Sequence, residues 1–142
     1  MRSVQVHLIN ASPEDVRAAL SEFAQQHAPE QWLYPCAARR PSLYIEFFTD
    51  FSAYQPDDFD RLERALGKRP DISVIADVSG RVPGHVEIRA FVECLLTRFR
   101  GIAYDELALH CWTLSEIRSG AAVDGHQFFD YEGWHRDITC ES

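Results

Sequence analysis

The sequence has almost no lysine and a clear deficit of positive charge. Lys68 is the single lysine among fourteen basic residues, these face twenty-two acidic ones, and the formal net charge is −8. The resulting negative field repels phosphate backbones and anionic membrane surfaces, so we expect neither nucleic-acid binding nor membrane binding. The same field attracts cationic partners. The preference for arginine is typical of GC-rich bacterial genomes.

The sequence also lacks the signatures of the common enzyme families. It contains no GxGxxG, GxxxxGK[ST], HExxH or GxSxG motif and no EF-hand loop, so dinucleotide, phosphate-loop, zincin, α/β-hydrolase and calcium functions lose their best support. The cysteines form no CxxC pair and show no structural-zinc spacing; they are Cys36, Cys94, Cys111 and Cys140. No secretory start and no apolar run of about 20 residues is present. We therefore expect a cytoplasmic protein with reduced thiols and no cofactor.

The pattern of apolar residues predicts alternating strands and helices in one domain, residues 1–142. A two-residue period predicts strands at 4–9, 42–51, 72–78 and 103–112. Residues 31–38 are predicted to form a weaker strand or an extended segment, in which Pro35 indicates an edge position or a bend. A helical period predicts helices at 13–27, at 57–66 before Gly67, and between Gly84 and Gly101, with Gly101 following the helix end. A capping box at Thr113–Glu116 predicts one more helical turn.

This order predicts an α+β fold: a ferredoxin-like sandwich (β-α-β-β-α-β) extended by an additional helix and strand, with an aromatic C-terminal tail. Helices then cover one face of the sheet. The strand periods place a set of polar residues on the opposite face, together with Ile9, Phe48, Ile75 and Trp112. That polar set is Gln5, His7, Tyr44, Glu46, Ser73, Asp77 and His110.

Two acidic regions are candidates for partner binding. One opens the predicted helix at 57–66, and the other lies in the aromatic segment 125–134. The aromatic segment either folds back over an apolar surface or forms a recognition surface, because tyrosine and tryptophan beside acids are typical of binding hot spots. The candidate partner-binding residues are Asp57, Asp58, Asp60, Asp130, Tyr131, Glu132 and Trp134.

Two other constellations offer enzymatic alternatives. Histidines and a carboxylate near the C-terminus are suitable ligands for zinc or iron in a small hydrolase, although no two of the histidines are spaced as a helical pair. These residues are His110, His126, Asp130 and His135. On the sheet, an imidazole oriented by a carboxylate is suited to act as a general base, and His7, Asp77 and His110 are the candidates there.

The stretch from His110 to Ile117 and the later run Phe128-Phe129-Asp130-Tyr131, within a small acidic α+β domain, resemble bacterial immunity proteins of polymorphic toxin systems. The resemblance covers the C-terminal part of the chain and implies no catalytic residue. It implies a non-enzymatic inhibitor that binds a cognate toxin domain in the cytoplasm. An acidic inhibitor is complementary to a basic toxin cleft.

The sequence therefore leads to three functional hypotheses. The first is an acidic immunity-type inhibitor that docks on a basic toxin domain and occludes its active site. The second is the metal-dependent hydrolase or another small enzyme. The third is an assembly subunit whose open sheet face mediates a homodimer.

Overall fold

The computed structural model describes residues 2–35, 40–51, 55–105, 107–131 and 133. These residues form an α+β fold with a six-stranded sheet and four helices. In chain order the elements are β1 (Arg2–Ile9), α1 (Pro13–Phe23), β2 (Gln25–Ala28), β3 (Gln31–Tyr34), β4 (Leu43–Phe48), α2 (Pro56–Leu66), β5 (Ile72–Val78), α3 (His85–Leu96), β6 (Arg100–Tyr104) and α4 (Leu114–Ser119). None of these helices has the length and apolar character of a bilayer-spanning segment.

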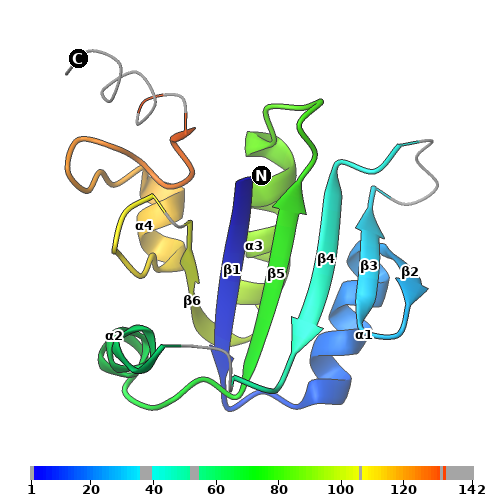
Figure 1. The fold of residues 1–142 in the computed structure, drawn as a ribbon, viewed down its shortest axis with the longest axis horizontal. Coiled ribbons are helices and arrows are strands. Elements are labelled where there is room, and N and C mark those ends of the chain that lie inside the picture. The colour runs from blue at the N-terminus through cyan, green and yellow to red at the C-terminus, as the bar shows by residue number, and fades with distance from the viewer. Residues whose placement is uncertain (1, 36–39, 52–54, 106, 132, 134–142) are drawn as a thin grey trace.

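The sheet has the strand order β2-β3-β4-β5-β1-β6, and each neighbouring pair is antiparallel. Helices α1 and α3 lie behind the sheet in Figure 1 and connect strands that are not neighbours. Helix α4 and the segment that follows it lie beside α3 and β6. The chain therefore builds one covered sheet face, with β1 next to the edge strand β6.

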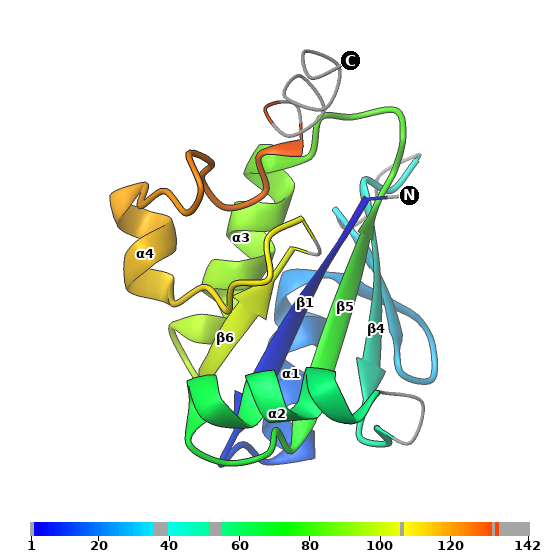
Figure 2. The same ribbon diagram turned by 60° about the vertical axis from the view of Figure 1, so that its left-hand side comes forward.

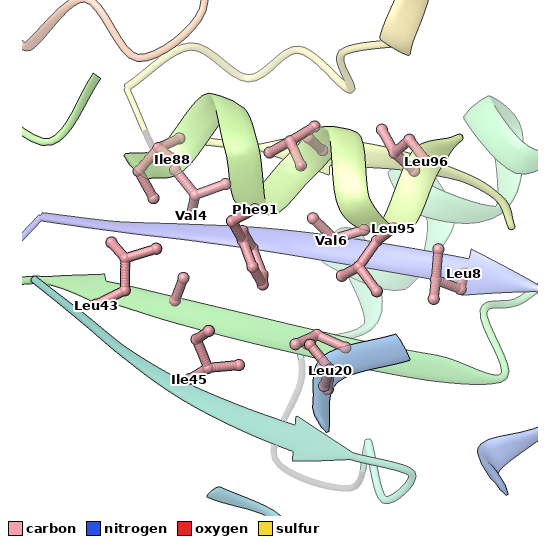
Figure 3. Close-up of a cluster of buried hydrophobic side chains, with 14 of the residues drawn as sticks. Val4, Val6, Leu8, Leu20, Leu43, Ile45, Ile88, Phe91, Leu95 and Leu96 are labelled. Carbon is pink, nitrogen blue, oxygen red and sulfur yellow. The ribbon is translucent and has the colours of Figure 1, made fainter. Parts of the chain in front are cut away.

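The main hydrophobic core fills the space between the sheet and α1 and α3. Alternate residues of β1 point into it, as do the apolar stripes of both helices, and the side chains interdigitate in Figure 3. The inward residues of β1 are Val4, Val6 and Leu8, and Phe91 of α3 packs against them. Burying aliphatic and aromatic side chains in this way stabilises the fold by roughly 1.5–3 kcal/mol for each residue.

Helix α2 corrects the prediction that helices cover only one face. It crosses the lower end of the opposite, second face of the sheet, as Figure 2 shows. Its buried residues Leu62 and Leu66 form a small separate core with Ile9 and Ile102. The spacing of Leu62 and Leu66 predicted an amphipathic helix, but not which face of the sheet it covers. Gly67 ends this helix in the left-handed conformation, as predicted (φ 84°).

Helix α1 ends earlier than the predicted range 13–27. Ala24 has an extended backbone, and the next four residues form β2, which pairs with β3. After Ala24 the chain offers no apolar residue to continue the stripe before Ala28, so pairing with β3 satisfies the backbone better than one more helical turn. Strand β2 takes the edge of the sheet. The predicted edge strand at 31–38 is therefore the internal strand β3, which ends at Tyr34.

The region around β6 also differs from the prediction. Helix α3 ends at Leu96, and Gly101 belongs to β6 rather than following the helix end. A Cβ atom on Gly101 would lie 2.2 Å from the carbonyl oxygen of His7, so the close approach of β6 to β1 requires a glycine. Strand β6 ends at Tyr104 instead of running over 103–112, and the chain returns only at Trp112, which forms a bridge with Ala103.

Candidate functional site

In the part of the chain that the structure describes, no helix or loop lies over the second face at β3, β4 and β5, above the level of α2 (Figure 1). Tyr44 of β4 lies opposite Asp77 of β5 on one side and Leu33 of β3 on the other. The Tyr44 side chain is 45% exposed, and it is one of three large hydrophobic side chains identified as exposed in the described part of the chain. An exposed aromatic ring beside a carboxylate is a combination that favours contact with cations.

Glu46 adds a second carboxylate to this face. Its side chain is exposed, and its Oε1 atom accepts a hydrogen bond of 2.9 Å from Nε2 of Gln31 on the neighbouring strand. Strands β3, β4 and β5 contain no lysine and no arginine. We call this surface the open face; its residues are Leu33, Tyr44, Glu46 and Asp77. It combines the exposed ring of Tyr44 with the carboxylates of Glu46 and Asp77.

The strand register confirms the predicted orientation of six of the seven polar residues. Gln5 lies opposite Ile75, which lies opposite Glu46, and His7 lies opposite Ser73. His110 is the exception, because it lies outside the sheet in the loop after β6. Trp112 was also predicted on this face, and that prediction is wrong. It lies in the main core on the covered side, since its bridge partner Ala103 faces α3.

The buried histidine on this face is part of a neutral polar network. Nδ1 of His7 lies 2.5 Å from Oγ of Ser73, and Nε2 lies 3.1 Å from Oε1 of Gln5. Because the Gln5 oxygen only accepts, Nε2 carries the proton and Nδ1 accepts from the serine hydroxyl. Burial lowers the pKa of His7 to about 4, so the ring is neutral at physiological pH.

The predicted general-base constellation is therefore not assembled. Asp77 lies opposite Ser3, four residues along β1 from His7, and His110 lies on a different part of the molecule. Nε2 of His110 lies 3.0 Å from Oε2 of Glu116. Although burial opposes it, hydrogen bonds from the Thr113 backbone and from His110 hold the pKa of Glu116 below its usual value. The same glutamate closes the capping box at the start of α4, as the sequence predicted.

Asp105 holds the C-terminal segment in place. No sequence pattern marked this residue as a candidate. Its carboxylate is fully buried and accepts hydrogen bonds from the backbone N–H groups of Leu107, Ala108 and Phe129. The Tyr131 hydroxyl donates to the Asp105 carbonyl oxygen over 2.7 Å. The only local signal is an aspartate followed by a run without helical or strand period, which is typical of turn-forming side chains.

The aromatic segment packs against the core in its described part. Phe129 is buried, and its ring contacts the rings of His85 and Tyr131. Asp130 accepts a 2.8 Å hydrogen bond from Nδ1 of His126, so this carboxylate is oriented within the segment. Two other candidate residues of this segment, Glu132 and Trp134, lie outside the described residues.

The predicted metal ligands do not come together in the described part of the chain. No group of three or more histidine, cysteine, aspartate or glutamate side chains is placed there to hold a metal ion. His110 pairs with Glu116, whereas His126 pairs with Asp130, and His135 lies outside the described residues. Cys36 and Cys140 also lie outside them. Burial raises the pKa of the thiols of Cys94 and Cys111, both of which are free.

The acidic residues of α2 lie at the border of the second face. Asp57 and Asp60 are exposed, and Asp58 pairs at 3.4 Å with Arg61 on the next turn. The described partner-binding candidates therefore occupy two regions: α2, and the segment beside β6. Tyr44 and Glu46 were predicted to face this side but were not named as partner-binding residues.

A cleft of about 300 Å³ lies between α3, α4 and the C-terminal segment. Its floor is apolar, with Ile88 and Phe129, and its rim carries Arg89 and Arg118. Both arginines pair with Glu93, at 3.8 and 3.0 Å. The guanidinium groups are thus already partnered within the protein.

Comparisons of this chain with family models, with curated proteins and with solved structures find no match. The geometry of the open face and the net charge of the chain are therefore the observations that bear on its function.

Proposed function

We propose that this protein is a non-enzymatic, acidic binding protein of the immunity type, which docks on a basic toxin domain through the open face and occludes its active site. The observation that supports this proposal is the exposed ring of Tyr44 on β4, which also carries Glu46, next to Asp77 of β5, with no basic residue on either strand. Arginine and lysine side chains of a partner have there an aromatic face to stack on and the exposed carboxylate of Glu46 to pair with.

The net charge supports the same proposal at long range. A formal charge of −8 accelerates the encounter with a basic domain, and the open face then provides the short-range contacts. Asp57 and Asp58 add carboxylates at the border of this face. The proposed partner-binding set also includes Asp60 of α2 and, in the segment beside β6, Asp130 and Tyr131. Glu132 and Trp134 belong to this set too, but they lie outside the described residues.

We also infer that the fold is a ferredoxin-like sandwich with additions. The order β4-β5-β1-β6, with α1 between β1 and β4 and α3 between β5 and β6, supports this assignment. The β2–β3 hairpin then extends one edge, and α2 is an insertion between β4 and β5. The predicted elements are the same in kind, but α3 rather than α2 is the second crossover helix.

The test starts from the gene neighbourhood, where the proposal expects a gene for a basic toxin domain. Direct binding to that domain is then measured as association rates between about 50 and about 300 mM salt. We expect an equimolar complex whose association rate falls steeply with salt. Glu46→Lys and Asp77→Lys should each weaken binding at least about tenfold, since they place a like charge opposite a basic surface.

The matched control is Glu14→Lys, which makes the same charge change on exposed residue 14 of α1, on the covered side. It should slow association slightly and leave the dissociation rate unchanged. No complex with the neighbouring domain, or equal weakening by Glu14→Lys and Glu46→Lys, would overturn the proposal.

A further inference from the structure

The outer side of α2 carries a stripe of charge that changes sign along the helix. At 3.6 residues per turn these positions lie opposite the buried Leu62 and Leu66. The first half of the stripe is acidic and the second half is basic. Its residues are Asp57, Asp60, Arg61 and Arg64, followed by Lys68 just beyond the helix end.

Several of these charges are not neutralised within the protein. Among the described residues, Asp57, Asp60 and Arg64 make no ion pair; the Arg64 guanidinium donates instead to the Asp60 carbonyl oxygen over 3.2 Å. Arg61 pairs with Asp58 at 3.4 Å. Lys68 lies 3.7 Å from Asp71, and its ammonium group donates a 2.9 Å hydrogen bond to Oδ1 of Asn10. The stripe is therefore available to charges from outside the chain.

An exposed apolar side chain lies beside the basic half of the stripe. Leu109 is 73% exposed, and it borders a shallow groove of about 430 Å³. The groove is lined by Arg61, Arg64, Ala65, Leu109, His110 and Cys111, with no carboxylate among them. A protruding leucine and a groove with room for a leucine thus lie next to each other on one surface.

We propose that this surface binds a second copy of the same chain, with the two α2 helices antiparallel across a two-fold axis level with Leu62. In that register Asp60 of each copy lies opposite Arg64 of the other, and Glu63 lies opposite Arg61. Leu109 of each copy enters the groove of the other. A two-fold interface uses the same patch twice, so the patch must be complementary to itself.

The change of sign along the helix favours a second copy over another partner. An acidic partner would match only the basic half of the stripe, and a basic partner only the acidic half. The antiparallel copy matches both halves at once. Because each copy carries a formal charge of −8, long-range repulsion opposes association and the local match has to exceed it. This inference does not depend on the proposed toxin binding.

The experiment is sedimentation equilibrium of the full chain at about 150 mM salt, where the Debye length is about 8 Å. We expect a reversible dimer. Asp60→Arg and Arg64→Asp should each weaken it at least about tenfold, because each places two pairs of like charges across the axis. The double variant Asp60→Arg/Arg64→Asp keeps the net charge and restores complementarity, so its dimer should return, as should the dimer in an equal mixture of the two single variants.

Two further variants separate this dimer from other assemblies. Leu109→Ser should weaken it, whereas Glu22→Arg, an exposed charge reversal on α1, should not. Circular dichroism confirms that each variant is folded. A wild-type chain that stays monomeric would overturn the proposal. A dimer that survives Asp60→Arg would also overturn the proposal. So would a dimer that Tyr44→Arg dissociates while the double variant Asp60→Arg/Arg64→Asp fails to restore the dimer lost in the single variants, since the open face would then be the interface.

Discussion

The two faces of the sheet are built from the same strands but carry different kinds of side chain. On the covered face, β1 contributes Val4, Val6 and Leu8 to a dry core against α1 and α3. On the second face, the same strand contributes Gln5 and His7 to a polar network. Alternation along one strand thus gives the two faces different chemistry: the covered face holds the fold together, and the second face, where we propose that a partner binds, carries polar, aromatic and acidic side chains above α2.

The largest expected effect is on the covered face. Phe91 is fully buried at its centre, so Phe91→Ala should lower the free energy of unfolding by about 3–5 kcal/mol. Tyr44→Ala on the open face should change it by no more than about 0.5 kcal/mol. Urea denaturation followed by circular dichroism measures both. Similar losses for the two variants would contradict the division between the faces.

The next effect concerns the one buried ionisable group of the second-face network. Below pH 6.5 an unfolded chain protonates His7, whereas the folded chain resists protonation down to about pH 4. The unfolded state therefore binds more protons in this window, and stability falls as the pH falls. This residue alone should cost about 3 kcal/mol by pH 4.

The check is thermal unfolding of the wild type and of His7→Gln between pH 7 and pH 4. The slope of stability against pH should be shallower in the variant, because glutamine does not titrate. Equal slopes would show that other groups cause the acid sensitivity.

A smaller effect is expected where the C-terminal segment joins the core. Asp105→Asn replaces one accepting oxygen with an NH₂ group, so either the N–H of Phe129 or those of Leu107 and Ala108 lose their acceptor. The cost should be about 2 kcal/mol. Hydrogen exchange at the Phe129 amide should accelerate more than exchange in β1. Asp124→Asn, at an exposed position in the same segment, is the control and should leave exchange unchanged.

The smallest effect is expected at the open face itself. Glu46→Gln keeps an oxygen for the hydrogen bond from Gln31 and should alter the free energy of unfolding by less than about 0.5 kcal/mol. Partner binding should nevertheless weaken, because a carboxylate is lost. Calorimetric titration and denaturation of the same sample separate the two quantities.

Local patterns predicted most elements and failed where distant contacts decide. Alternation located β1, β4 and β5 to within a few residues, and the stripe that includes Ile88 and Phe91 located α3. The predicted end of α1 was wrong because the residues after Ala24 pair with β3 instead of continuing the helix. Gly101 was misread because its need for space comes from the His7 carbonyl on another strand.

The sequence predicted on which face of the sheet the side chains of the candidate site lie, but not which residues form the site. Strand period placed Tyr44, Glu46 and Asp77 on one face, because period depends only on sequence neighbours. Which part of that face stays uncovered depends on where α2 crosses it, and the spacing of Leu62 and Leu66 does not say. Composition drew attention to the aromatic segment instead, although burial of Phe129 makes part of it structural.

The hydroxyl of Tyr131 reaches back to the carbonyl oxygen of Ser3, near the start of the chain. During synthesis at about 5–20 residues per second, several seconds pass between the appearance of the two residues. Strand β1 lies between β5 and β6, so it waits for both of its neighbours with two unpaired edges. A nascent chain thus displays the two unpaired edges of β1 for seconds before its neighbours exist.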